Sequence, residues 1–141
     1  MKVPKITVVG SSNTDLVAKA PRLPLPGETV IGSKFIIAPG GKGANQAVAI
    51  ARLGCDVTFV AKLGMDDFGD QAINNFKKDN INTDFIFRTS NSPSGVALIF
   101  VDDSGENSIV AVQGANAELL PEDVEKARSA IEQSDILVLQ L

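Results

Sequence analysis

Hydrophobic and polar positions follow two periods along the chain. Short apolar runs with the composition of strands alternate with longer stretches in which apolar residues recur at helical spacing. The strand-like runs are 6–9, 57–61 and 136–141, and the helical stretches are 44–53, 68–79 and 121–133. This alternation predicts a parallel sheet with helices on its faces. The run 136–141 is apolar at nearly every position, which is typical of a strand buried on both faces of such a sheet.

A second set of segments pairs like hairpins. After a polar turn at 11–15, the strand-like segment 16–20 is separated from the apolar stretch 28–38 by a proline-rich loop. The segments 95–101 and 107–112 flank a polar turn. These pairs predict a small, separate antiparallel sheet. The chain is therefore expected to be α/β, with a parallel-rich sheet, flanking helices and a small antiparallel sheet.

Helix-end signals support these boundaries. Gly54 follows the first helical stretch at the position where glycine often ends a helix. Asp66 or Asp67 is suited to be the N-cap of the second helix, and Asn80 closes it. A metal-binding role for this pair of aspartates is the less favoured alternative.

Residues 40–46, with the sequence GGKGANQ, form the most informative stretch for function. Glycine lets the backbone approach a ligand closely and adopt positive φ. The first N–H groups of a helix lack partners within it, so this corner could offer bare donors to hydroxyls or to an anion. A glycine turn that merely starts a helix is the simpler alternative. Neither the phosphate-binding GxxxxGK[ST] pattern nor the dinucleotide-binding GxGxxG pattern is present.

Composition narrows the classes of function. The chain has 141 residues, 44% of them hydrophobic, and a net charge of −4. The negative charge argues against nucleic acid or an acidic membrane surface as a partner, and no apolar run is long enough to span a membrane. A single cysteine excludes a disulfide framework and fits a reduced, cytoplasmic setting. Because histidine is absent, acid–base chemistry would have to use carboxylates or lysine.

The motifs in combination resemble those of the ribokinase-like (PfkB) carbohydrate kinases. The family's glycine-rich signature begins at 40–47 and continues with Gly54 and Gly64 at the family's spacing. An N-terminal G-S-x-N-x-D pattern, a P-G-E-T pattern, a glycine-led hairpin and a G-A-N sequence are also present. These four matches lie at residues 10–15, 26–29, 95–107 and 114–116. The resemblance covers essentially the whole chain.

The resemblance implies a three-layer α/β sandwich that carries a β-sheet lid, with lid strands at about 16–38 and 95–112. It also implies that residues 1–141 are the N-terminal part of one ribokinase-like domain, incomplete at the C-terminus. The sequence itself favours this expectation, because the chain stops inside its most apolar strand.

The implied reaction is transfer of the γ-phosphoryl group of ATP to a primary hydroxyl of a sugar, with D-ribose as the expected acceptor. Matching positions give the expected sugar-binding residues. These are Asn13, Thr14, Asp15, Gly41, Lys42, Gly43, Ala44, Asn45, Ala97 and Ile99. Carboxylate and amide groups at such a site can select for hydroxyls. Simpler roles stay open: Asp15 could cap a turn, Asn13 could adopt a left-handed conformation, and Lys42 could lie in solvent instead of near the phosphoryl group.

One family feature does not occur in this chain. The family's catalytic Asp lies in a G-A-G-D segment, so we expect the base, the ATP site and a further sugar-binding Glu beyond Leu141. ATP, Mg²⁺ and a monovalent cation would then act in the parent enzyme. Residues 1–141 alone should not catalyse the transfer, because phosphoryl transfer depends on positioning and charge stabilisation at both substrates.

If a longer parent protein carries the lid, its edge strands could pair across a two-fold axis, so we expect a homodimer. The single cysteine favours a cytoplasmic protein. Two alternatives remain. One is a family kinase that acts on a nucleoside, fructose or deoxyribose, and the other is a non-catalytic binding or dimerising module.

Overall fold

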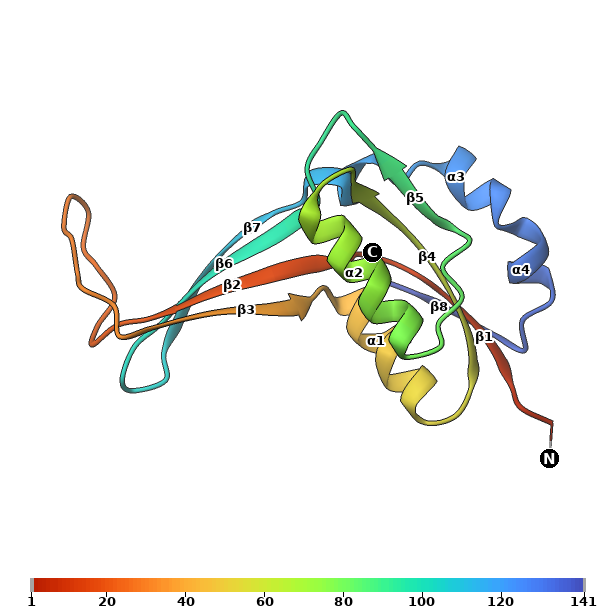
Figure 1. Ribbon diagram of the computed structural model, residues 1–141, viewed down its shortest axis with the longest axis horizontal. Helices are drawn as coiled ribbons and strands as arrows, with labels where there is room; N and C mark the ends of the chain where they lie inside the picture. Colours follow the sequence, from red (N-terminus) through yellow and green to blue (C-terminus); the bar gives the residue numbers. More distant parts are fainter. Residues whose placement is uncertain (1, 141) are drawn as a thin grey trace.

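The computed structural model describes residues 2–140, which form two four-stranded sheets (Figure 1). The core sheet has the strand order β5-β4-β1-β8. Its strands are β5 (Ile86–Thr89), β4 (Asp56–Gly64), β1 (Lys5–Val9) and β8 (Ile136–Leu139). All neighbouring strands in it run parallel, as the alternation of strands and helices predicted.

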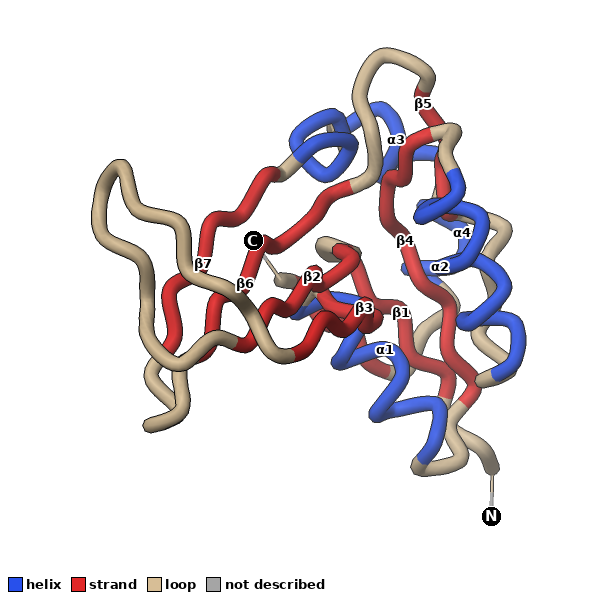
Figure 2. The backbone as a smooth tube through the Cα atoms, turned by 60° about the vertical axis from the view of Figure 1, so that its left-hand side comes forward, coloured by secondary structure: helices blue, strands red, loops and turns tan. Residues whose placement is uncertain are grey.

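The outer sheet has the strand order β3-β2-β6-β7 and projects away from the core sheet (Figure 1, Figure 2). Its strands are β3 (Lys34–Gly40), β2 (Asn13–Lys19), β6 (Gly95–Val101) and β7 (Asn107–Val112). Each predicted hairpin is antiparallel, but β2 and β6 pair in parallel and join the two hairpins. The predicted small antiparallel sheet is therefore confirmed, with one parallel pair, β2 with β6, that turn signals could not predict because they report only local pairing.

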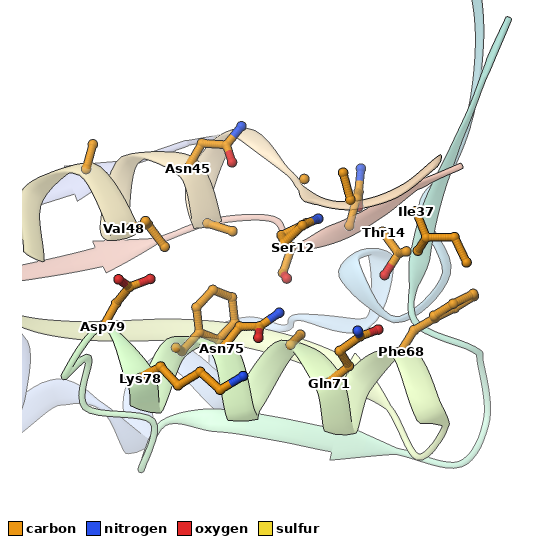
Figure 3. A pocket seen from close by; sticks show the side chains of 18 of the residues that line it. Ser12, Thr14, Ile37, Asn45, Val48, Phe68, Gln71, Asn75, Lys78 and Asp79 are labelled. Atoms are coloured by element: carbon orange, nitrogen blue, oxygen red, sulfur yellow. The ribbon is translucent and has the colours of Figure 1, made fainter. Parts of the chain in front are cut away.

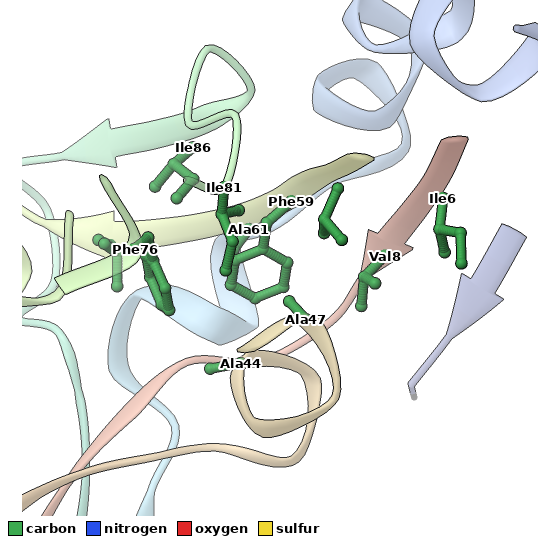
Figure 4. Packing of buried hydrophobic residues seen from close by; sticks show 11 residues of the cluster. Ile6, Val8, Ala44, Ala47, Phe59, Ala61, Phe76, Ile81 and Ile86 are labelled. Carbon is green, nitrogen blue, oxygen red and sulfur yellow. The ribbon is translucent and has the colours of Figure 1, made fainter. Parts of the chain in front are cut away.

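Helices cover both faces of the core sheet. They are α1 (Lys42–Arg52), α2 (Asp67–Lys78), α3 (Pro121–Lys126) and α4 (Arg128–Glu132), and the short 3-10 helix η1 (Gly114–Glu118) precedes α3. On the face covered by α1 and α2, the rings of Phe59 and Phe76 pack edge to face, with their centroids 5.2 Å apart (Figure 4). On the other face, Ala127 packs against Val9 and Val60. The expected three-layer sandwich is confirmed.

The sequence located most helix ends. Gly54 has φ of 91° directly after the α1 C-cap, and Asn80 has φ of 56° after the end of α2. Asp66 is the N-cap of α2, and its carboxylate accepts a hydrogen bond from the Gly69 N–H at 2.8 Å. Helix α1 begins at Lys42, two residues earlier than predicted, because Gly41 with φ of 94° turns the chain from β3 directly into the helix.

Two predicted segments have different boundaries. Residues 28–33 form no strand, and residues 13–15 belong to β2 instead of a turn. The helical stretch 121–133 is divided at Ala127, whose N–H bonds to the carbonyl of Val124 three residues back and tightens the chain there.

Strand β8 is not buried on both faces as predicted. Ile136 and Leu139 are 53% and 59% exposed. The reason is its position at one edge of the core sheet, where β1 is its only partner among the described strands.

Ser94 anchors the outer sheet to the core sheet. The Asp66 carboxylate accepts hydrogen bonds from the Ser94 N–H and hydroxyl, both at 2.7 Å, and the Ser94 hydroxyl accepts one from the Gly64 N–H at 3.0 Å. Burial acts to raise the pKa of Asp66, but the hydrogen bonds from Ser94 and Gly69 outweigh it and lower that pKa. Asp66 is thus occupied as a structural acceptor, as the N-cap prediction required.

None of the helices within residues 2–140 combines the length and the apolar character needed to cross a lipid bilayer.

Candidate functional site

The predicted residues Asn13 and Asp15 lie at the start of β2, close to the junction with the core sheet. Asp15 pairs in register with Ala97 of β6, and Val17 pairs with Ile99. Since alternate side chains of a strand share a face, Asn13, Asp15, Ala97 and Ile99 lie on one face of the outer sheet, called here the Asp15 face. Asn13 is in a strand, and Asp15 caps no turn, so the two simpler roles are excluded.

The Asp15 carboxylate stands against the backbone of Gly40, where any Cβ would overlap it. Burial raises the pKa of Asp15, because the charged form loses contact with water. Within residues 2–140, no protein group donates a hydrogen bond to this carboxylate. A partly desolvated carboxylate without a donor favours a ligand that brings hydroxyl protons.

Glycine at the start of α1 allows the helix to touch the turn that follows β1. A Cβ at Gly41 would lie 2.7 Å from Ser12 Cα, and one at Gly43 would lie 2.7 Å from the Ser11 nitrogen. The predicted close approach therefore exists, but the chain's own turn occupies it.

The expectation of bare N–H groups from Gly41 to Asn45 was wrong for most of this corner. The Gly43 N–H donates to the Gln140 side chain at 3.1 Å, and the Ala44 N–H donates to the Ser11 carbonyl at 2.9 Å. The Asn45 N–H bonds to the Gly41 carbonyl at 2.9 Å. Gly41 and Lys42 remain the candidate backbone donors.

Lys42 and Asn45 are exposed side chains in the first turn of α1. Figure 3 shows the Asn45 amide pointing away from α2. Both side chains can therefore reach a ligand at the helix start.

Gln140 completes this corner and was missed as a site residue. Its Oε1 accepts hydrogen bonds from the Ser11 N–H at 3.0 Å, from the Ser11 hydroxyl and from the Gly43 N–H. A polar residue directly after the apolar strand 136–139 was the available signal.

Asn116 of η1 was also missed. Its side chain bonds to both backbone polar groups of Ser12 and to the Asn13 side chain, which places it directly behind the start of β2. The sequence showed it only within the G-A-N motif, without a role.

A cavity of about 680 Å³ lies between α1 and α2 (Figure 3). Thr14 and Ile37 line it from the face of the outer sheet opposite the Asp15 face, and the predicted residues Asn13, Ala44 and Asn45 line it as well. Asp15, Ala97 and Ile99 do not belong to its lining. The structure therefore places the Thr14 side chain on the face opposite Asp15, because neighbouring side chains on a strand point to opposite faces.

Comparison with known proteins identifies the family of this chain. Residues 3–140 match the sequence model of the family described as "pfkB family carbohydrate kinase". The chain belongs to the pfkB family of carbohydrate kinases. The ribokinase of Mus musculus is 46% identical over 136 residues, which cover 96% of this chain and 42% of that protein.

Solved structures of pfkB-family proteins agree with the fold. The ribokinase structure from Giardia lamblia has a TM-score of 0.90 and 36% sequence identity to this chain. The alignment covers 99% of this chain and 42% of the Giardia lamblia chain. A second structure is that of Arabidopsis thaliana ribokinase complexed with ribose and ATP, with a TM-score of 0.84 and 32% sequence identity. The alignment covers 99% of this chain and 46% of the Arabidopsis thaliana chain. This pfkB-family chain thus spans less than half the length of these relatives.

Residues 2–140 contain no group of three His, Cys, Asp or Glu side chains that could hold a metal ion. The N–H groups of Gly43, Ala44 and Asn45 are engaged within the protein, so the start of α1 is no phosphate cradle.

Proposed function

We propose that the full-length protein carrying this chain is an ATP-dependent kinase that phosphorylates D-ribose, with residues 1–141 supplying part of the sugar site. The observation that carries this proposal is the Asp15 face, where a carboxylate that has no donor among residues 2–140 lies beside an amide and two apolar side chains. The ribokinase relatives support the same reaction.

The residue types match the chemistry of a sugar. The Asp15 carboxylate can accept hydroxyl protons, and the amides of Asn13 and Asn45 can bond to hydroxyl oxygens. Ala97 and Ile99 can cover the apolar C–H side of the ring. The outer sheet would act as the lid over the sugar, and Lys42 would bring positive charge toward the transferred phosphoryl group.

The nucleotide side of the reaction is proposed to lie outside residues 1–141. ATP, with Mg²⁺ and a monovalent cation as expected activators, would bind other residues of the parent protein, which would also supply the catalytic base. Apart from the positive charge of Lys42, no part in phosphoryl transfer is therefore assigned to the described residues. We expect residues 1–141 alone to be inactive.

The outer sheet is the proposed homodimer contact. Within residues 2–140, β3 and β7 each pair with one strand only, and every residue of β7 is exposed. Exposed edges with apolar side chains favour pairing with a second copy. We also propose that the protein works in the cytoplasm. Light scattering of the full-length protein at micromolar concentration should give a dimer, and a monomer would contradict this contact.

The decisive experiment compares acceptors with the purified full-length protein. We expect ATP-dependent phosphorylation with the highest kcat/KM for D-ribose among D-ribose, 2-deoxy-D-ribose, D-fructose and adenosine. Asp15→Ala and Asn45→Ala should each lower kcat/KM for ribose about five- to a hundredfold, the cost of one lost hydrogen bond that involves a charged or buried group. A preference for another acceptor would replace ribose in the proposal. Unchanged kcat/KM in both variants would contradict the site.

A further inference from the structure

Asn116 lies where the outer sheet meets the core, in the middle of η1. Its Oδ1 accepts a hydrogen bond from the Ser12 N–H at 2.9 Å. Its Nδ2 group donates to the Ser12 carbonyl at 3.1 Å, to the Gln113 carbonyl at 2.9 Å and to the Asn13 Oδ1 at 2.8 Å. One side chain thus joins η1 to the start of β2, more than a hundred positions earlier in the chain.

The backbone of Ser12 decides which way the Asn116 amide points. A backbone N–H can only donate and a carbonyl can only accept. The Asn116 oxygen must therefore face the Ser12 N–H, and its NH₂ group must face the Ser12 and Gln113 carbonyls. The atom of Asn13 next to that NH₂ group must then be an acceptor. Asn13 turns its oxygen toward Asn116, and its own NH₂ group points elsewhere.

Gly95 at the start of β6 leaves room for this contact. A Cβ there would overlap the Asn116 Nδ2 and would lie 2.5 Å from the Asn13 Oδ1. The first residue of β6 is in register with Asn13. A larger residue at position 95 would therefore push the two amides apart.

We propose that Asn116 is a positioning residue of the sugar site, which holds the Asn13 amide so that its NH₂ group donates to a sugar hydroxyl oxygen. The proposal rests on the proposed sugar-kinase function. Asp15, two residues along the same face, accepts from a hydroxyl, so the pair offers one donor and one acceptor side by side. Asn116 itself touches no sugar.

The first test is a double-mutant cycle in the full-length protein, with Asn116→Asp, Asn13→Ala and both together. The carboxylate introduced at position 116 would place a second acceptor against the Asn13 oxygen, so the Asn13 amide would turn over and withdraw its donor. This carboxylate would also face the Ser12 and Gln113 carbonyls, so the same loss of stability is expected with Asn13 and with Ala at position 13. We expect the KM for ribose to rise about tenfold, the scale of one lost hydrogen bond, with the KM for ATP and kcat unchanged. In the Asn13→Ala background, Asn116→Asp should not raise the KM for ribose any further. If the two substitutions raise this KM independently, so that their fold-changes multiply in the double variant, the proposal is overturned.

Asn13→Asp tests the same orientation with the contact to Asn116 retained. The carboxylate introduced at position 13 still accepts from the Asn116 NH₂ group, so the melting temperature should stay at the wild-type value. It presents an acceptor to the sugar where Asn13 presents a donor, and the KM for ribose should rise at least about tenfold. An unchanged KM would overturn the proposal. Asn74→Asp, an exposed asparagine of α2, is the matched control and should change neither quantity.

A readout independent of activity separates this proposal from the kinase function. NMR of the full-length protein, labelled with ¹⁵N at asparagine, reports solvent exchange of the Asn13 side-chain amide protons without sugar. These protons should exchange quickly in the wild type and slowly in Asn116→Asp, where they donate to the new carboxylate. Equal exchange rates would overturn the positioning role. A wild type without kinase activity would overturn the proposed function alone.

Discussion

The core sheet and the outer sheet are built from similar apolar strands but differ in how much they bury. Val57, Phe59 and Val60 of β4 are fully shielded from solvent, because α1 and α2 cover one face and α3 and α4 the other. In the outer sheet, Phe35 and Ile109 are 63% and 55% exposed. Strand composition alone therefore does not predict a buried strand, since burial depends on what covers each face.

One face of the outer sheet shows this difference most clearly. The large apolar side chains on the face opposite the Asp15 face come from all four strands. They are Leu16, Phe35, Ile37, Val96, Leu98, Phe100, Val110 and Val112. Most of them are exposed, although apolar side chains usually gain stability only when water is removed from them. The exposed apolar face lies between the free edges of β3 and β7, so a second copy that pairs with these edges could also cover part of it.

The largest expected effect comes from removing a core ring. Phe59→Ala should lower the free energy of unfolding by about 3 to 5 kcal/mol, because it leaves a cavity beside Phe76. Phe100→Ala in the outer sheet removes the same atoms from a side chain that is 39% exposed. Urea unfolding of the full-length protein should show a clearly smaller loss for Phe100→Ala. Equal losses would contradict the contrast between the two sheets.

A smaller effect is expected for the buried ion pair that holds α3 to β4. Lys62 and Asp123 lie 2.7 Å apart, with side chains 14% and 8% exposed. Asp123→Asn should cost about 2 to 3 kcal/mol, because Lys62 keeps a buried charge without its partner. The hydrogen bond from Lys62 lowers the pKa of Asp123. The stabilisation is thus present above about pH 4 and is lost as the pH falls through the lowered pKa.

Unfolding at pH 7 and at pH 3 checks this prediction. The difference between wild type and Asp123→Asn should be large at pH 7 and smaller at pH 3. A difference that does not depend on pH would show that the charge is not the cause.

At the Asp15 face, activity and stability should move in opposite directions. Asp15→Asn should lower kcat/KM for ribose about tenfold or more. Because burial raises the pKa of Asp15, the folded state holds its proton more tightly, and the charged form destabilises the fold as the pH rises. The variant should therefore be slightly more stable than wild type at pH 7, with a smaller gain at pH 4. A less stable variant at pH 7 would argue for a structural role.

The smallest effect is expected in the loop between β2 and β3. Arg22 and Glu28 form an ion pair there, and the hydrogen bond from Arg22 lowers the pKa of Glu28 to about 2. Exposed pairs contribute little, because water screens them. Glu28→Gln should leave the melting temperature unchanged within error, and a clear loss would show that this loop is better packed than its exposure indicates.

The contrast between the sheets also marks how far the sequence predicted the fold. The strands and helices of the core followed from their periods, and Gly54 and Asp66 ended and began helices as expected, because these signals are local. The parallel pairing of β2 with β6 was not predictable in this way. It joins residues 82 positions apart along the chain, Asp15 and Ala97 for example.

The sequence by itself determined the family, the core elements and the candidates Asn13 and Asp15, because motif spacing and hydrophobic period are local properties. Only the tertiary structure decided how these groups are used. It engages the amides of Gly43 and Ala44, sends Thr14 to the opposite face, and sets the Asn13 amide through Asn116. The physical reason is distance along the chain: Gln140 reaches Gly43 across 97 positions, and Asn116 reaches Asn13 across 103. Only folding brings such partners within hydrogen-bond reach.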